Sequence, residues 1–279
     1  MSPSLAILLI TLAAMLFGAG VLHLVPRLGP AGRALSSALC RAPLLDLVIT
    51  YFTAGPMIAG PIAGARLSPE TPGLGAALGL LAAVLGQIGA VVVWTVLHEA
   101  AHPGARRGPR IVHTLNRKVG PVRNHVAVWW TAWAVPVFWI IRVAQYFVYP
   151  PLTWLVRLPK YRAEEWINVS RHKFRGLVGH DLIWCLYCDW MTGVWSLAGE
   201  MLRNVESFWC PIRFDSTKKC ENCSVDYPDI AGGWVAADAD MEAVARVLDE
   251  KYPGPGGMNP WFGHPVRLTV EGKARSPES

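Results

Sequence analysis

The stretch Leu74–Leu97 reads LGAALGLLAAVLGQIGAVVVWTVL and contains no charged residue. An α-helix needs about 20 apolar residues to cross the hydrocarbon core of a bilayer, so this stretch predicts a membrane span. Its glycines Gly75, Gly79, Gly86 and Gly89 recur at helical spacings, which lets a neighbouring helix approach closely. We therefore expect a helical membrane bundle to organise the fold.

Two further apolar stretches come before this one. Leu5–Val25 has no basic leader and no A-x-A cleavage site, so we interpret it as an uncleaved anchor and not as a signal peptide. Leu44–Ala65 carries Asp46 near its start, and the short loop 66–73 joins it to the third stretch as a hairpin. The sequence thus predicts a region of transmembrane helices over residues 1–97.

The composition of the 279-residue chain agrees with this prediction. Hydrophobic residues make up 52% and charged residues only 16%, whereas about a quarter of the residues of a soluble protein are charged. Thirteen Trp and long aliphatic runs exclude intrinsic disorder, and six Cys are too few for a disulfide scaffold. The chain is expected to be an integral membrane protein with an additional soluble part.

A fourth apolar region, Val126–Val156, is long enough to span a membrane but contains Arg142 and three prolines. A charged side chain at the bilayer centre costs at least about 2.5 kcal/mol. The region is also rich in Trp and Tyr, which is typical of the headgroup boundary. We favour an interfacial or re-entrant aromatic helical segment, and a fourth membrane helix remains the alternative.

Basic residues are concentrated in the middle of the chain. Residues 1–97 hold four basic and two acidic residues, residues 98–175 thirteen and three, and residues 176–279 nine and fifteen. Since no module for reading nucleic acid accompanies the basic segment, we expect it to contact anionic membrane lipids and predict no nucleic-acid partner.

The orientation follows from the preference of Lys and Arg for cytoplasmic loops. It predicts an amino terminus outside, most simply in a bacterial inner membrane. Residues 98–125 would then be a basic, His-rich cytoplasmic loop, and residues 157–279 a cytoplasmic metal-binding domain.

Residues 98–102 read HEAAH, which is an HExxH pattern. On a continuous helix His98 and His102 share one face and can bind a metal, while Glu99 polarises its water as the catalytic residue. Pro103 follows at once and is expected to end the helix, which weakens the zinc metallopeptidase interpretation. The alternative is that these polar residues simply end a membrane helix at headgroup level.

The longer stretch HEAAHPGARRGPRIVHTLNRKVG, residues 98–120, resembles the first histidine box of membrane fatty-acid desaturases and hydroxylases. Those enzymes place H-x-x-x-H at the cytoplasmic end of a span, followed by basic residues. The resemblance implies iron bound by histidines and the oxidation of a lipid-like substrate by oxygen. The chain has no adjacent His pair of the kind found in that family's later boxes. The metal ligands that we expect in this loop are His98, His102, His113 and His125.

The cysteines suggest a second metal site. Cys185 and Cys188 form one CxxC element, and Cys220 and Cys223 form another. Two such elements about thirty residues apart fit a site of four thiolates for zinc or iron, with His180 as a substitute ligand. Unlinked thiols, disulfides and a redox-active CxxC remain alternatives.

The remaining tail is expected to be mainly helical. Residues 193–208 predict a helix with Glu200 on its solvated side. The residues expected on its inward face are Leu197, Met201, Leu202 and Val205. Asp238–Lys251 predicts an amphipathic helix and Val266–Val270 a short strand. The expected fold is therefore mainly α, a bundle of three spans with a small cytoplasmic Cys-rich α+β domain.

Three functions are compatible with these patterns. We favour a metal-dependent membrane oxidoreductase that acts on an apolar, lipid-like substrate, with iron in the His loop and zinc or iron at the cysteines. The first alternative is a non-enzymatic accessory or assembly protein whose four-cysteine zinc site holds a domain that binds a protein partner. The second is a membrane zinc metallopeptidase. The chain contains no Walker-type GxxxxGK and no GxSxG element, so nucleotide-driven and serine chemistry have no support.

Overall fold

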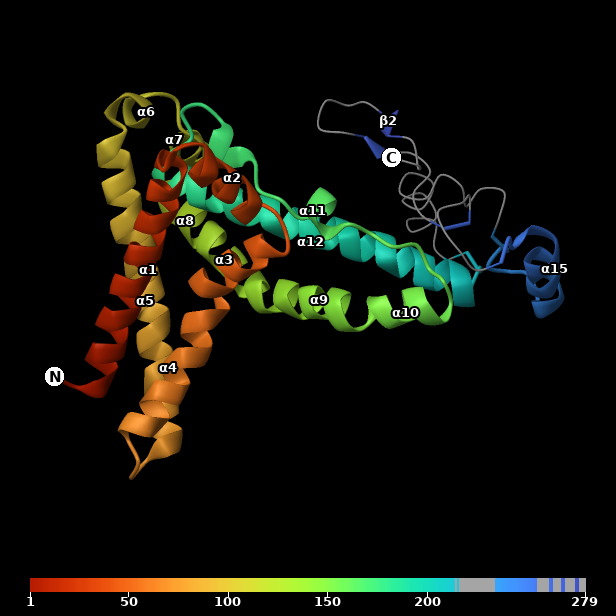
Figure 1. The fold of residues 1–279 in the computed structure, drawn as a ribbon, viewed down its shortest axis with the longest axis horizontal. Coiled ribbons are helices and arrows are strands. Elements are labelled where there is room, and N and C mark those ends of the chain that lie inside the picture. The colour runs from red at the N-terminus through yellow and green to blue at the C-terminus, as the bar shows by residue number, and fades with distance from the viewer. Residues whose placement is uncertain (214, 216–233, 255–260, 263–266, 269–273, 276–279) are drawn as a thin grey trace. The chain divides into compact units, whose positions relative to one another are not determined.

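The computed structural model describes the whole chain except residues 214, 216–233, 255–260, 263–266, 269–273 and 276–279. The described part is mainly helical (Figure 1). Packing divides the chain into two units, which we describe separately: residues 1–139 with 163–194, and residues 140–162 with 195–279.

The first unit begins with the helices of the predicted membrane region. Its elements up to residue 107 are α1 (Pro3–Leu24), η1 (Val25–Arg27), α2 (Gly29–Leu39), α3 (Leu44–Phe52), α4 (Ala54–Leu67), α5 (Pro72–Ala101) and α6 (Pro103–Arg107). The following elements are α7 (Ile111–Val119), α8 (Pro121–Trp130), η2 (Thr131–Ala134), α11 (Ala163–Trp166) and η3 (Arg171–Lys173). Helices α9 (Val135–Phe147) and α12 (Gly179–Trp209) each have residues in both units.

Helices α1, α4 and α5 run alongside one another (Figure 1). Small residues make the close approach of α4 and α5 possible: a Cβ on Gly64 would lie 2.0 Å from the carbonyl oxygen of Gly75, and one on Gly79 would lie 2.2 Å from that of Gly60. The close approach predicted from the glycines of the third stretch is therefore confirmed for Gly75 and Gly79.

Helices α3 and α4 together form the second apolar stretch, and they meet at a bend of 47°. The carbonyl oxygens of Phe52 and Thr53 lie at this bend, and Pro56 has no N–H to donate to that of Phe52. The side-chain amide of Gln87 on α5 donates to both, at 3.0 and 2.8 Å. This contact explains why a polar side chain interrupts the most apolar stretch of the chain, since an unsatisfied carbonyl inside a membrane costs several kcal/mol by rough estimate.

Three of the described helical segments are long and apolar enough to cross a membrane: Pro3–Arg27, Pro72–Ala101 and Pro121–Leu155. The number rises to four when the bent pair is counted as one span. The first and third predicted spans thus correspond to α1 with η1 and to α5. The segment Pro121–Leu155 contains the fourth apolar region.

The second unit contains the last residues of α9, helix α10 (Tyr149–Leu155), the second half of α12 and helix α15 (Met241–Lys251). A cluster of buried aromatic and aliphatic residues forms its core, namely Tyr149, Leu158, Trp234, Trp261 and Phe262. Helix α15 starts at Asp240, whose carboxylate accepts from the N–H of Ala243.

The strands in the described part of this unit are β1 (Arg267–Leu268) and β2 (Ala274–Arg275), which pair antiparallel. Two strands of two residues do not support the Cys-rich α+β domain that we expected. The reason is that the cysteines of its first half, Cys185 and Cys188, belong to a long regular helix, α12, and so do not form loop knuckles.

Candidate functional site

The HExxH pattern lies where α5 ends. His98 and Glu99 belong to the last turn of α5, whereas His102 has a non-helical backbone (φ −125°, ψ 61°) and α6 begins at Pro103. The predicted helix end before Pro103 is confirmed, because proline lacks the N–H that a continuing helix requires. The two histidines therefore do not share the face of one continuous helix, as metallopeptidase ligands do.

The imidazoles of the pattern lie close together, with their planes tilted by 33°. The ring centroids of His98 and His102 are 4.4 Å apart. The ring of Trp94 stacks on that of His98, with the two centroids 4.5 Å apart. His23 of α1 joins the group, with its ring centroid 5.3 Å from that of His98. The planes of His23 and His98 are also tilted, by 32°.

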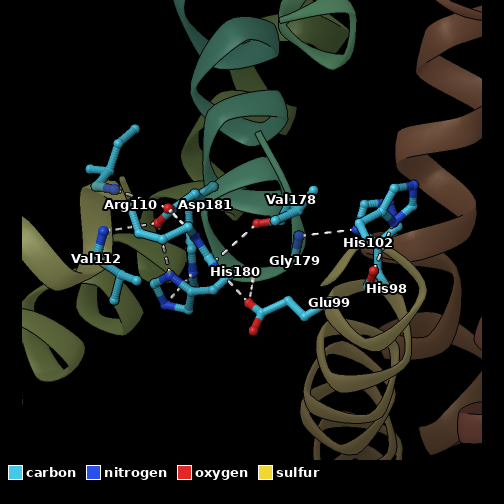
Figure 2. Close-up of polar contacts among 11 residues, drawn as sticks. His98, Glu99, His102, Arg110, Val112, Val178, Gly179, His180 and Asp181 are labelled. Atoms are coloured by element: carbon cyan, nitrogen blue, oxygen red, sulfur yellow. Dashed lines mark hydrogen bonds and ion pairs between the residues drawn. The ribbon is translucent and has the colours of Figure 1, made fainter. Parts of the chain in front are cut away.

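The carboxylate of Glu99 forms an ion pair with the buried side chain of Arg110 (Figure 2). Nη2 of Arg110 donates to Oε1 of Glu99 at 2.8 Å, and Nε of Arg110 donates to Oδ2 of Asp181 at 2.9 Å. The side chain of Arg110 is only 2% exposed, so both charge-assisted bonds are shielded from water.

The same contacts complete the start of α12. The N–H of Gly179 donates to Nδ1 of His98 at 3.1 Å, and the N–H of His180 donates to Oε1 of Glu99 at 3.4 Å (Figure 2). The first N–H groups of a helix have no partner within it, and negative charge near them is favourable. His98 and Glu99 thus act together as a cap for α12.

Asp181 caps a second helix. Its carboxylate accepts from the N–H groups of Ile111 and Val112, both at 3.0 Å, at the start of α7. Helices α5, α7 and α12 therefore meet at one connected set of polar residues. We name this set the α5–α12 joint, and it consists of His98, Glu99, Arg110, Gly179, His180 and Asp181.

The charges of the joint stabilise one another. Burial by itself raises the pKa of Asp181, but the nearby Nδ1 of His180 and the guanidinium of Arg110 outweigh it and hold the pKa below its ordinary value of 3.8. Burial likewise lowers the pKa of Arg110, and its two carboxylate partners outweigh it and raise the pKa. All three ionised groups are therefore favoured in the folded protein.

Hydrogen bonds also assign the proton on two of the histidines. Nδ1 of His98 accepts from Gly179, so the proton of the neutral ring is on Nε2. Nε2 of His180 accepts from the indole N–H of Trp184 at 3.2 Å, and its Nδ1 lies 3.7 Å from Asp181. A neutral imidazole has one lone pair, so in this arrangement His98 and His180 have none left for a metal. His102 differs, because its Nδ1 lies 2.8 Å from the carbonyl oxygen of His98, which leaves Nε2 as an acceptor.

The other predicted ligands do not join the His98–His102 pair. His113 is exposed on α7. His125 packs edge-on against His180, with ring centroids 5.2 Å apart. Among the residues that the structure describes, no group of three or more His, Cys, Asp or Glu side chains is arranged to hold a metal ion.

The first CxxC element lies on α12, as the sequence predicted. Cys185 and Cys188 are free, half-buried thiols, and Arg171 of η3 lies against them. Burial raises the pKa of Cys185, and a hydrogen bond from Arg171 opposes this only in part. Cys220 and Cys223, the second element, lie outside the described residues, so the four-thiolate site stays a prediction.

Sequence reasoning missed Arg110, which pairs with Glu99, Asp181, which pairs with Arg110, and His23, whose ring lies against that of His98. For His23 a signal existed. The first and third spans of a bundle run in the same direction, so the carboxyl ends of Leu5–Val25 and Leu74–Leu97 lie on one side of the membrane. His23 and His98, at these two ends, are therefore expected on the same side. No family model, curated protein or solved structure matches the chain.

Proposed function

We propose that the protein is an integral membrane accessory protein, in which the α5–α12 joint anchors the first turn of α12 to the membrane helices, and the exposed side of the second half of α12 binds a protein partner. One observation carries this proposal: the HE dipeptide of HExxH is bonded to α12. Oε1 of Glu99 accepts from Arg110 and His180, and Nδ1 of His98 accepts from Gly179. A general base needs a free lone pair directed at a water, and a ligand needs one directed at a metal.

The exposed side of α12 supports the second half of the proposal. Trp195, Leu202 and Trp209 are all more than half exposed and recur every seven residues, so they share one face of the helix. Large apolar residues in such a row are typical of a surface that another helix covers.

A matched pair of variants within HExxH separates a joint from a metal site. If His98 serves to cap α12, His98→Ala removes this cap and lowers the free energy of unfolding by about 0.5–2 kcal/mol. His102→Ala should then change the free energy of unfolding little. His98→Asn, whose side-chain oxygen can replace Nδ1 as acceptor, should retain most of the stability. Thermal unfolding in detergent measures this, and plasma mass spectrometry of the same samples measures bound metal. Equal loss of metal in both alanine variants, with unfolding unchanged, would contradict the proposal.

The partner is tested by photo-crosslinking in living cells. A photoreactive amino acid at Leu202 is expected to give a discrete protein adduct, and the same amino acid at Met241, which is equally apolar and 70% exposed on α15, should not. The adduct at Leu202 should disappear when Trp195 and Trp209 are replaced by Ser. Adducts that are identical at Leu202 and Met241 would remove the support for a docking face.

The favoured alternative is the metal-dependent oxidoreductase, with zinc or iron. The observation in its favour is the gathering of His23, His98 and His102 at the ends of α1 and α5. It predicts redox metal that is lost in His23→Ala as well as in His102→Ala, and an absorption spectrum that changes with it. The zinc peptidase has less support, because Glu99 is paired with Arg110.

A further inference from the structure

The segment α9–α10 has two different sides. Ile140, Phe147 and Trp154 recur every seven residues and are 70–79% exposed. Arg142, Gln145 and Tyr149 lie on the opposite side, and each is at most 6% exposed. An aqueous surface would favour the reverse arrangement, with the charged side outside and the apolar side buried.

The buried side carries a cluster of polar groups. Nη1 of Arg142 donates to Oε1 of Gln145 and Nη2 donates to the hydroxyl of Tyr146, both at 2.8 Å. The guanidinium carbon also lies 4.2 Å from the centre of the Tyr146 ring. Neutral oxygen acceptors and an aromatic ring thus satisfy donors of the buried guanidinium, which keeps its positive charge.

The polar side continues onto α12. Glu200, Arg203, Asn204 and Ser207 occupy one face of the second half of α12 and are 0–5% exposed. The side-chain amide of Asn204 donates to the hydroxyl of Tyr149 at 3.2 Å and to that of Tyr161. The hydroxyl of Tyr161 in turn donates to Oε1 of Glu200 at 3.3 Å. This polar network joins α10 to α12 beside the apolar core, against which Leu152 of α10 and Met201 and Val205 of α12 pack.

We propose that α9–α10 lies in the interfacial layer of the lipid bilayer, with its exposed apolar side in contact with lipid and its polar side on α12, and that it does not cross the membrane. This inference does not depend on the proposed function. Length and composition would allow Pro121–Leu155 to cross. Crossing would, however, place Arg142 and the charged residues of α12 together near the bilayer centre, where each charge costs at least about 2.5 kcal/mol.

The occupant of the exposed side is lipid because this face belongs to Pro121–Leu155, a segment apolar enough to enter a membrane, whereas α12 with its Trp195–Leu202–Trp209 row is not such a segment. Trp154, Phe147 and Ile140 combine aromatic rings with aliphatic side chains and carry no charge. Trp is enriched where hydrocarbon meets headgroups, and an amphipathic helix lies in that plane with its apolar face a few ångströms deep, roughly 5–10 Å. The polar α12 behind it keeps the opposite side of α9–α10 out of the hydrocarbon.

Depth is the first test. A genetically encoded fluorescent amino acid replaces Ile140, Trp154 or, as a deep control, Leu85 in the middle of α5. The protein is reconstituted into vesicles that contain lipids with a doxyl quencher either near the headgroup or deep in the chain. Positions 140 and 154 are expected to be quenched more by the shallow lipid, and position 85 more by the deep one. Deep quenching at position 140 with shallow quenching at 154 would mean that the segment crosses. No quenching at either position would mean that protein covers this face. Both results overturn the proposal.

Sidedness is the second test, and it does not require the depth to be known. Lys118→Cys and Lys160→Cys place a thiol at exposed positions on either side of the segment. A membrane-impermeant maleimide is added to sealed vesicles of known orientation, and mass spectrometry of the peptides identifies the labelled site without removal of native cysteines. Both positions should be labelled from the same side. Labelling from opposite sides would contradict the proposal.

Discussion

At the scale of single residues, Arg110 determines how the joint behaves. It is the one cation placed between Glu99 and Asp181 in the joint, and its guanidinium also donates to the carbonyl oxygen of Val178 at 3.2 Å. Removing one member of such a buried set leaves an uncompensated charge, which typically costs about 3–5 kcal/mol. The strength of the joint therefore depends on Glu99, Arg110 and Asp181 all being ionised.

The stability of the protein should accordingly fall in acid. The pKa of Asp181 in the folded protein is below its ordinary value of 3.8, so the stabilisation is fully present above about pH 3.8 and is lost as pH falls through the lower folded pKa. Thermal unfolding in detergent between about pH 6 and about pH 3 measures this. Asp181→Asn should be less stable at about pH 6 and should lose less stability on acidification. Parallel curves for the two proteins would show that Asp181 does not carry the effect.

The joint also shows which residues a sequence can and cannot reveal. The end of α5 was predictable because the signal is local: Pro103 must stop a helix. The pairing of Arg110 with Asp181 was not, because 71 residues separate them and either one alone resembles an ordinary surface charge. The HExxH pattern is visible in the sequence. Its spacing does not show where the carboxylate of Glu99 points, so the sequence alone does not decide whether the pattern forms a metal site.

At the scale of elements, α12 shows the same limit in its packing. The helix and its buried Leu197 were predicted, but Leu202 is 57% exposed and Glu200 is buried, the reverse of the expectation. Apolar periodicity assumes that a helix turns its apolar side to the protein. Met201 and Val205 do pack against the core, but Asn204 beside them donates to the hydroxyl of Tyr149 on α10, and such polar contacts are invisible to the rule.

The first residue of α12 offers a test at this scale. Gly179 has φ +54°, and a Cβ there would lie 2.2 Å from Oε1 of Glu99, so Gly179→Ala both strains the backbone and displaces the carboxylate from Arg110. We expect a loss of at least about 1–2 kcal/mol from the backbone alone. Gly199→Ala is the matched control on the same helix, because no atom lies within 4 Å of its Cβ position, and it should gain up to about 1 kcal/mol. Thermal unfolding measures both, and equal effects would argue against a tight joint.

At the scale of the whole molecule, the distribution of charge is the main predictor of orientation. Thirteen basic residues lie between residues 98 and 175, and the loop 66–73 contains only Arg66. If α9–α10 stays in the interface, the basic residues before and after it share one side of the membrane. A crossing segment would instead place six of them, Arg157, Lys160, Arg162, Arg171, Lys173 and Arg175, on the opposite side from Arg106 and Arg107.

Reporter fusions decide the absolute orientation. With the loop after α5 in the cytoplasm, green fluorescent protein fused after Ser279 should fluoresce, and alkaline phosphatase at the same point should be inactive because it needs an oxidising exterior to form its disulfides. Alkaline phosphatase inserted into the loop 66–73 should be active. An active phosphatase after Ser279 would place the tail outside, where the thiols of Cys185 and Cys188 would be exposed to oxidation and the charge argument would have failed. Combined with labelling of Lys118→Cys and Lys160→Cys, this result separates an inverted bundle, in which both thiols move together to the outside, from a crossing segment, in which only the second one does.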